Sequence, residues 1–141
     1  MDEIITDYAS SEEQNGNSTR VLQVPTVALR GMTVLPGLVI HFDLSRTKSI
    51  LAVEQAMMSD QRVFLVGQKD VEEDDPDYTK VYHMGCLAQI KQVTRLPENV
   101  VRVLVEGLDR AILRGFSDEE KNYLVGEIEI VESPLHLEGV A

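Results

Sequence analysis

The chain has 141 residues, a formal net charge of −11 and a hydrophobic content of 43%. This size and hydrophobicity suffice for one folded domain with a real core, and they argue against a wholly disordered chain. The negative charge disfavours nucleic acids and anionic membranes as partners, because both are bound through Lys and Arg. One cysteine excludes an intrachain disulfide, and no apolar run is long enough for a membrane span or signal peptide. We therefore expect a cytoplasmic protein.

The N-terminal residues 1–19 are rich in Ser, Asn, Asp and Glu and show no sustained period, which predicts a disordered tail. The next segment, residues 21–30, favours a strand in which Pro25 marks an edge or a bend. A turn is predicted at Leu35-Pro36-Gly37, since proline presets φ and glycine permits positive φ. Residues 38–44 then favour a second strand.

One convincing helix is predicted, over residues 46–58. Ile50, Val53 and Met57 recur at a spacing that places them on one helical face. Ser45 is the predicted N-cap, because its hydroxyl can accept a hydrogen bond from a free amide of the first turn.

The remaining strands follow from apolar patterning. Residues 62–68 form a continuous apolar run that is typical of a strand buried on both faces, and an acidic loop follows at 69–80. Residues 84–95 and 100–107 are predicted to form a hairpin around the turn 96–99. Alternation places Cys86, Ala88 and Ile90 on one face of their strand. It predicts these side chains to be buried: Val101, Val103, Val105, Ile128 and Ile130. It predicts these to be more exposed: Arg102, Glu106, Glu127 and Glu129.

The sum is about six short strands and one helix. Short strands separated by turns favour a small, mostly antiparallel barrel or folded-over sheet. The helix is expected to cover an open side, because a half-closed sheet leaves one apolar face to bury. The predicted class is therefore mostly β, of the α+β type.

Motifs for catalysis and cofactor binding are absent from the sequence. It contains no phosphate-binding loop, no dinucleotide fingerprint, no G-x-S-x-G and no H-E-x-x-H. His83 and Cys86 are three residues apart on a predicted strand and so point to opposite faces, which disfavours a metal site. The acidic loop lacks the spacing of a calcium site and is interpreted as a solvated loop. We expect no catalytic, cofactor or metal residue here.

The candidate site lies in the apolar stretch "MTVLPGLVIHF", residues 32–42. A short strand cannot direct all of these side chains inward, so part of the stretch is expected to form an exposed apolar patch that binds other polypeptides. The predicted polypeptide-binding residues are Met32, Leu35, Val39 and Phe42. The alternative is a pair of buried strands. Met57 and Met58 suit promiscuous binding or core filling equally.

Four segments in order carry a family resemblance: "VALRGMTVLPGLVIHF", "RTKSILAVEQAM", "VFLVGQKD" and "HMGCLAQIKQVTRLPENVVRVLVEGLDRA". Over about residues 24–133 they resemble the N-terminal (LAN, substrate-binding) domain of the ATP-dependent Lon proteases. The most specific matches are Leu29-Arg30, Pro36, Arg46, Lys48-Ser49, Val66, Gln68-Lys69, Gly85, Leu96-Pro97 and Val103 to Gly107. The family usually shows Pro at Ala28 and His41, Gly at Ser45, Glu at Thr47 and an Asp-Gly-type turn at Glu98-Asn99.

This resemblance implies a PUA-like pseudo-barrel of about six strands with one covering helix. It implies a Lon N-terminal-type domain over residues 20–133 and a truncated linker, 134–141, toward absent downstream domains. The implied partners are unfolded, misfolded or degron-bearing polypeptides and the other subunits of a homohexamer. The implied parent is a Ser-Lys endopeptidase, whose ATP and Mg belong to an ATPase domain outside this chain. No catalytic residue is carried over.

Three alternatives stay open from the sequence. The chain could be a self-standing Lon-domain adaptor, or a PUA-like RNA-binding module. The basic residues that could form an RNA-binding stripe are Lys91, Arg95, Arg102, Arg110 and Arg114. The net charge of −11 argues against that reading. An unrecognised enzyme is the least favoured alternative, because no nucleophile, metal or phosphate motif is seen.

Overall fold

The computed structural model describes residues 21–117 and 122–131. The tail predicted at 1–19 and the linker predicted at 134–141 lie outside these residues. The described elements, in chain order, are β1 (Val21–Leu29), β2 (Val39–Leu44), α2 (Thr47–Met57), β3 (Arg62–Gly67), η1 (Tyr78–Lys80), β4 (Met84–Leu96), η2 (Pro97–Asn99), β5 (Val100–Phe116) and β6 (Leu124–Ile130). The predicted class, mostly β with one covering helix, is confirmed.

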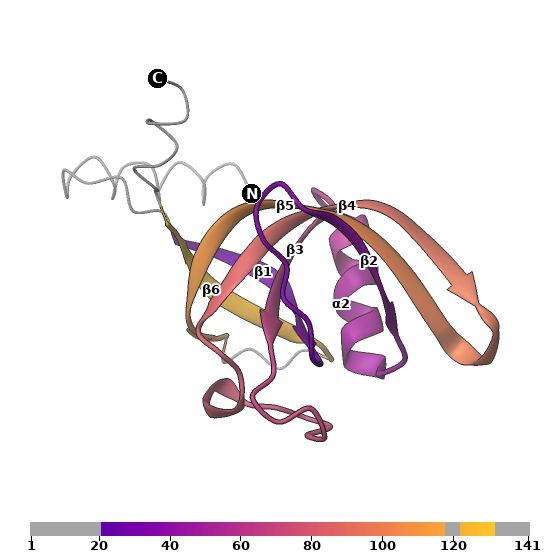
Figure 1. Cartoon of the computed structure of the whole chain (residues 1–141), viewed down its shortest axis with the longest axis horizontal. Coiled ribbons are helices and arrows are strands. Elements are labelled where there is room, and N and C mark those ends of the chain that lie inside the picture. Colours follow the sequence, from indigo (N-terminus) through magenta and orange to yellow (C-terminus); the bar gives the residue numbers. More distant parts are fainter. Residues whose placement is uncertain (1–20, 118–121, 132–141) are drawn as a thin grey trace.

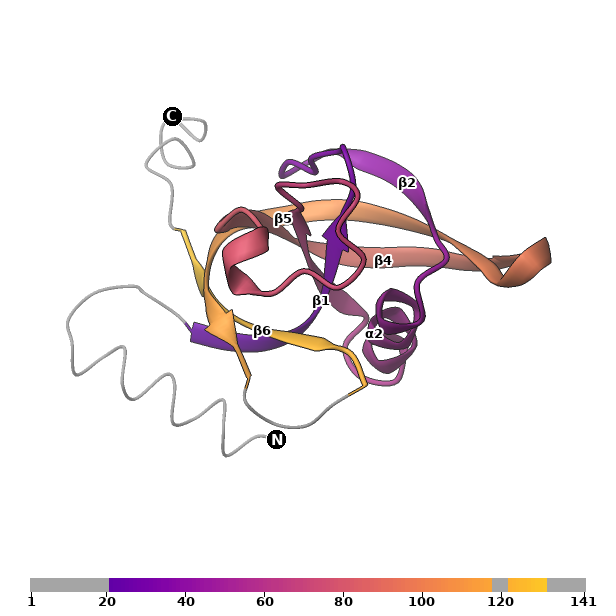
Figure 2. The same ribbon diagram turned by 90° about the horizontal axis from the view of Figure 1, so that it is seen from below.

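The sheet closes on itself and leaves one strand outside the ring. Its order is β2-β5-β4-β3-β1-β6, and β5 also pairs with β6, so five strands form a ring (Figures 1 and 2). Every pair is antiparallel except β1 with β3. The strand outside the ring, β2, pairs with the first half of β5.

The long strand β5 belongs both to the ring and to the hairpin that it forms with the second half of β4 outside the ring. Its first part pairs with β2 and β4, and its last part pairs with β4 and β6. The register shifts between Leu87 and Ala88, between Ile90 and Gln92, and between Leu113 and Gly115. Such irregularities increase local bend and twist, so one continuous strand can serve both parts (Figure 1).

The structure has two apolar cores, and the central strands separate them. In β3, Val63 and Leu65 belong to the core beneath α2, whereas Phe64 and Val66 belong to the core inside the ring. All four side chains are buried. This division confirms the prediction that residues 62–68 are covered on both faces, because successive side chains of a strand point to opposite faces.

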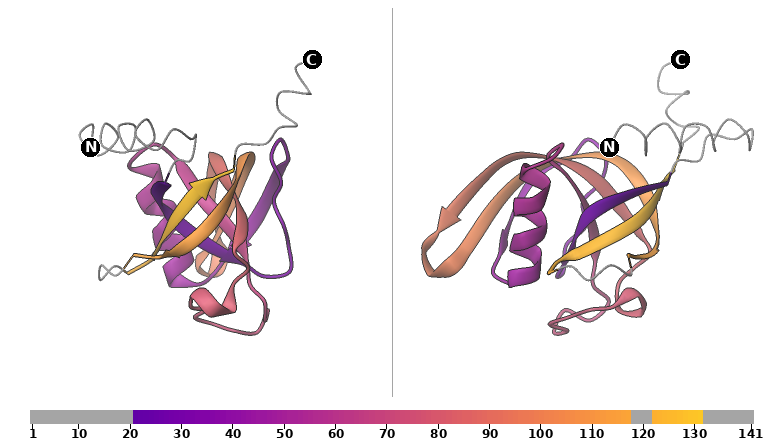
Figure 3. Two further views of the ribbon diagram at one scale, coloured as in Figure 1. Left: turned by 90° about the vertical axis from the view of Figure 1, so that its left-hand side faces the viewer. Right: turned by 180° about the vertical axis from the view of Figure 1, so that it is seen from behind.

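The helix α2 covers the outer core and packs mainly on β1 (Figure 3). Its buried residues are Ser49, Ala52, Val53 and Ala56. The predicted face is confirmed at Val53, which is buried, but it is wrong at Met57, which is exposed, and Ile50 is only half-buried. Small side chains let the helix approach the sheet closely. The larger apolar residues beside them give a stronger helical pattern in the sequence, so the pattern does not single out the small ones. The predicted N-cap was also wrong, because Arg46 occupies that position and makes no side-chain cap bond.

The hairpin and its alternation are confirmed. β4 and β5 pair around η2, in which Glu98 and Asn99 have φ of 66° and 62°. The side chains predicted to be buried are buried. Those predicted to be more exposed are half-buried or exposed: Arg102, Glu106, Glu127 and Glu129. Pro25 lies in the part of β1 that pairs with β6 alone, as an edge residue should. Across the described ranges, no helix is long and apolar enough to cross a membrane.

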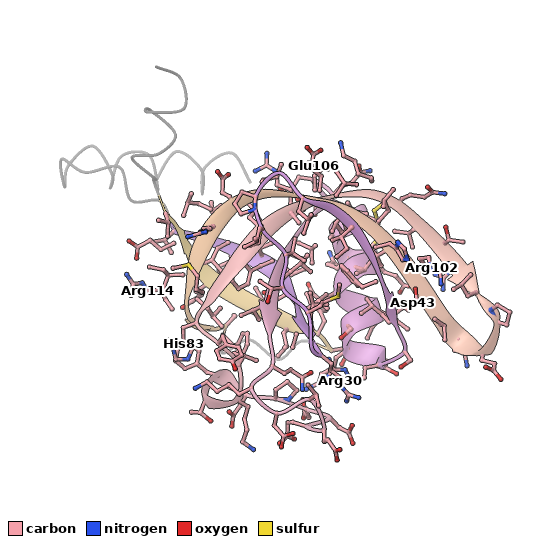
Figure 4. All side chains as sticks on the ribbon, viewed as in Figure 1. Arg30, Asp43, His83, Arg102, Glu106 and Arg114 are labelled. Carbon is pink, nitrogen blue, oxygen red and sulfur yellow. The ribbon has the colours of Figure 1, made fainter. Side chains whose placement is uncertain are left out.

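A cross-strand ion pair joins β2 to the first half of β5. Arg102 Nε and Nη2 donate to the two carboxylate oxygens of Asp43 at 2.8 and 3.0 Å, and the two residues are register partners (Figure 4). This hydrogen bonding holds the pKa of Asp43 below its ordinary value of 3.8. The pair therefore stabilises the fold only while Asp43 is ionised.

We expect this contribution to be lost on acidification. A carboxylate whose pKa is lowered by folding contributes stability above its unfolded pKa, and the contribution disappears as the pH falls through the folded value. Asp43→Asn should lower the free energy of unfolding at pH 7 and should reduce the loss of stability between pH 5 and pH 3, measured by urea unfolding. Asp60→Asn is the control, because Asp60 pairs with Arg62 only at 3.9 Å. Equal acid sensitivity of the Asp43 variant and the unmutated chain would contradict this role.

Candidate functional site

Three apolar side chains are exposed where the chain turns into β2. Leu38 N donates to Leu35 O at 3.1 Å, and Gly37 has φ of +83°, which suits the predicted Leu35-Pro36-Gly37 turn. Leu35, Leu38 and Val39 are 49%, 40% and 58% exposed. We call these three residues the turn surface. Such a group of exposed apolar side chains marks a place where another molecule can bind.

The turn surface is held in place by backbone contacts to β5. Gly37 N donates to Gly107 O, and Gly107 N donates to Leu38 O, both at 2.9 Å. A Cβ atom on Gly107 would lie 2.1 Å from Leu35 O. Glycine is therefore required at this position, because any side chain would collide with the backbone of the turn.

The predicted site residues have different environments in the structure. Leu35 and Val39 are exposed, as the patch hypothesis requires, and Leu38 joins them. Met32 is partly buried against the outer core. Phe42 is only 6% exposed, so it is a core residue and not part of an exposed patch. The reason is strand alternation: Phe42 is the register partner of the buried Val103 and points inward with it.

A cleft of about 490 Å³ adjoins the segment that leads into the turn. Met32, Thr33 and Val34 line it from one side, and Tyr82, Met84 and Val71 contribute exposed apolar surface. No pattern in the sequence predicts an exposed site at these last three residues. Met84 shares the parity of the buried Cys86, but it precedes the residues of β4 that pair with β3 and is therefore left exposed.

The acidic loop is tied to the domain by basic and amide side chains, most of them among the family-specific matches. Arg46 donates to Ala28 O at 2.6 Å and to Asp74 O at 3.2 Å. Arg30, near the lower edge of Figure 4, pairs with Asp74 at 3.0 Å. Gln68 Nε2 donates to two carbonyls of the loop, at 2.9 Å each. These matched residues therefore have a structural role, since they fix the loop beside the cleft.

Charge and burial change the pKa values of Arg46 and Cys86. Burial, together with the nearby Arg30, lowers the pKa of Arg46. Burial raises the pKa of the Cys86 thiol, so the thiolate nucleophile is disfavoured. His83 stacks on Tyr78 with ring centroids 4.1 Å apart. Among the residues that the structure describes, no group of three or more His, Cys, Asp or Glu side chains could hold a metal ion.

The basic residues of the β region are mostly neutralised by ion pairs. Arg95 pairs with Glu54 at 2.6 Å, Lys91 with Glu106 at 3.2 Å, Arg102 with Asp43 at 2.8 Å, and Arg114 with Glu129. Figure 4 shows Arg102 beside Asp43 on one side of the molecule, and Arg114 far from them on the other. They therefore do not form a free basic stripe of the kind that a polyanion needs.

The fold matches solved N-terminal domains of proteases. The N-terminal domain of a Mycobacterium avium complex Lon protease is similar with a TM-score of 0.65 and 21% identity, covering 79% of this chain and 56% of that one. A Lon N-terminal domain protein from Xanthomonas campestris has a TM-score of 0.60 and 17% identity, covering 82% of this chain and 67% of that one. At these identities the likeness concerns the fold alone. The structural class is that of a Lon-type N-terminal domain.

Sequence comparison defines the family. A model of the ATP-dependent protease La (LON) substrate-binding domain matches residues 23–139, so the chain belongs to this family. It is 47% identical over 113 residues to a Lon protease of Lachnoclostridium phytofermentans, covering 80% of this chain. It is 40% identical over 108 residues to Lon protease 1 of Bacillus subtilis, covering 77% of this chain. Each match spans 14% of the relative's length.

Gly107→Ala should disrupt the turn surface. The added methyl group would overlap the Leu35 carbonyl, so the free energy of unfolding should fall by about 1–3 kcal/mol, the usual cost of overpacking. Urea unfolding measures this change, and amide chemical shifts of residues 35–38 should move. Gly115→Ala is the matched control on the same strand, because its nearest atom would be 4.0 Å away. Similar stability of both variants would show that the turn does not depend on Gly107.

Arg46→Ala should loosen the acidic loop. The variant would lose two charged hydrogen bonds, a part-buried one to the Ala28 carbonyl and an exposed one to the Asp74 carbonyl, for a cost of about 1.5–3 kcal/mol in urea unfolding. Amide exchange of residues 70–77 should become faster. Lys48→Ala is the control, since its 2.7 Å ion pair with Asp75 is exposed and should contribute less. An unchanged exchange rate in the Arg46 variant would contradict the anchoring role.

Proposed function

We propose that this chain is the substrate-recognition domain of an ATP-dependent Lon-type protease, and that it binds unfolded or degron-bearing polypeptides. The observation that supports this proposal is the turn surface. It exposes Leu35, Leu38 and Val39 together on a backbone held by Gly107. Apolar side chains suit this task because unfolded chains share apolar segments rather than one sequence.

The neighbouring cleft extends the proposed binding surface. Met32 belongs to its wall, and Tyr82 and Met84 expose apolar area at it. A methionine side chain adapts its shape to different partners, and a tyrosine combines an apolar ring with a polar hydroxyl. The surface is smaller than a standard protein interface, so weak binding by one domain is expected.

Weak single-domain binding fits a role within an assembly. We propose that the domain acts joined to ATPase and Ser-Lys protease parts in a homohexamer, where several domains gain avidity for one substrate. ATP and Mg would bind in the ATPase part. A self-standing adaptor would use the same turn surface, and the size of the intact gene product distinguishes the two. RNA binding is disfavoured by the ion pairs that neutralise the basic residues.

Binding should depend on the turn surface. Leu35→Asp and Val39→Asp should each weaken binding of reduced, carboxamidomethylated ribonuclease by about tenfold, because each removes an apolar side chain from the contact. Isothermal titration gives the affinity, and chemical-shift changes should centre on residues 35–39. Both residues are exposed, so the variants should keep the fold.

Val21→Asp is the matched control, because Val21 is an exposed apolar residue at the other end of β1. It should bind the unfolded ribonuclease with unchanged affinity. Folded Leu35 and Val39 variants that bind as well as the unmutated chain would exclude the turn surface. Absence of binding by the unmutated chain would refute the proposed recognition role altogether.

A further inference from the structure

The strand β2 has an unpaired edge. It stands at one end of the sheet order, and within the described residues it pairs with β5 alone. The edge lies directly after the turn surface in the chain (Figure 1). It contains no proline and no lysine, the residues by which proteins commonly block an edge against pairing with another chain.

The hydrogen-bond pattern shows which amides face this edge. Gly107 N donates to Leu38 O, and these two residues come directly before and after the register pair Val39 and Glu106, so the register of β2 and β5 continues to them. In an antiparallel pair, residues with bonds to the neighbour alternate with residues whose N–H and C=O point away. Ile40 and Phe42 therefore bond to β5, whereas the backbone groups of Val39, His41 and Asp43 face the open edge.

The next strand pair supports this parity independently. Ile90 N donates to Gln61 O, on the side of β3, so Ile90 makes no amide bond to its partner Val105 on β5. The N–H and C=O of Val105 must then point to β2, where its register partner is Ile40. Both observations place the amide of His41 on the open edge.

A small cavity flanks the same edge. Its volume is about 120 Å³, and it lies between the second half of β2 and the end of β1. Its lining is mixed: Leu29, Met32, Phe42 and Leu44 contribute apolar side chains, and Arg30, Asp43, Ser45 and Arg46 contribute polar or charged ones. Because β5 occupies the other edge of β2, this cavity adjoins the unpaired one. A strand added beside β2 would direct alternate side chains toward it.

We propose that the open edge of β2 binds an extended segment of the substrate polypeptide by strand addition, with backbone hydrogen bonds at Val39, His41 and Asp43 and one substrate side chain directed toward the flanking cavity. This inference rests on the proposed function and adds a second contact to the turn surface. Main-chain pairing gives affinity without a sequence requirement, and a flanking side-chain pocket adds limited selectivity. Both properties suit a domain that recognises unfolded chains.

His41 lies between the other two edge-facing residues, Val39 and Asp43, and its side chain is exposed. A second copy of the chain is a poorer occupant of this edge than a substrate. Each molecule has a net charge of −11, and the repulsion between two such molecules opposes their association.

The test removes one amide without removing a bond of the fold. His41→Pro deletes the edge-facing N–H and leaves the β2–β5 bonds intact, since proline is tolerated on an edge strand when its nitrogen faces outward. His41→Ala is the matched control, because it removes the side chain and keeps the N–H. The probe is a fluorescent ten-residue peptide of alternating Val and Thr, together with the same peptide carrying N-methyl groups at alternate residues.

The expected result is a loss of affinity of about fivefold for His41→Pro, the effect of one backbone hydrogen bond, with little change for His41→Ala. N-methylation in the pairing register should weaken binding similarly, and peptide binding should slow amide exchange at Val39, His41 and Asp43. Equal affinity of the proline and alanine variants, or unchanged exchange at these amides, would overturn the proposal.

Two further outcomes distinguish the sources of failure. If unfolded ribonuclease binds in a Leu35-dependent manner but His41→Pro has no effect on either probe, the edge proposal fails and the proposed function stands. If the unmutated chain binds neither probe, both fail. Sedimentation of the free chain tests the remaining occupant: a dimer that His41→Pro abolishes would assign the edge to a second copy and overturn binding of substrate there.

Discussion

Burial of the central strands on both faces is the constraint on which the rest of this structure depends. In β3, Phe64 and Val66 fill the ring while Val63 and Leu65 pack beneath α2. A strand with apolar side chains on both faces must be covered twice, because each uncovered side chain would lose its transfer free energy. The ring supplies one cover and the helix supplies the other. α2 needs the small residues Ala52 and Ala56 to lie close enough to the sheet.

This arrangement also determines what remains outside. The ring uses β1, β3, β4, β6 and the far half of β5, so β2 can pair with only one neighbour. The segment between β1 and β2 must cross the end of the ring, and its backbone finds partners at Gly107 rather than in a regular strand pair. The exposed apolar residues and the open edge are thus products of the same closure. The proposed binding surface lies where the sheet stops pairing.

Much of the fold follows from the sequence because strands have a period of two. Parity alone could assign three side chains of β5 to the core: Val101, Val103 and Val105. The hairpin around Leu96-Pro97 could be predicted from the two strand-like runs that flank this turn. The helix face could be predicted only at Val53, since the rest of its contact with β1 depends on the small side chains of Ala52 and Ala56, which hydrophobicity undervalues. Phe42 differs from the predicted exposed patch because it points to the same side of β2 as Leu44, and both side chains are buried. The number of apolar residues in the segment does not reveal this parity. The exposure of Tyr82 and Met84 could not be predicted, because it depends on where β3 stops pairing with β4. That end point is set by the tertiary structure and not by the local sequence.

The docking of the turn on Gly107 has a consequence for the entropy of binding. A mobile loop that orders around a ligand loses backbone freedom worth about 1–2 kcal/mol per residue, and that loss is subtracted from its affinity. In this chain, hydrogen bonds from Gly37 and to Leu38 restrict the turn before any partner arrives. In the proposed binding mode, an unfolded partner would then bear nearly all of the ordering cost. Selectivity between a folded protein and its unfolded form would accordingly depend on the partner's own flexibility, with the domain serving as a preorganised template.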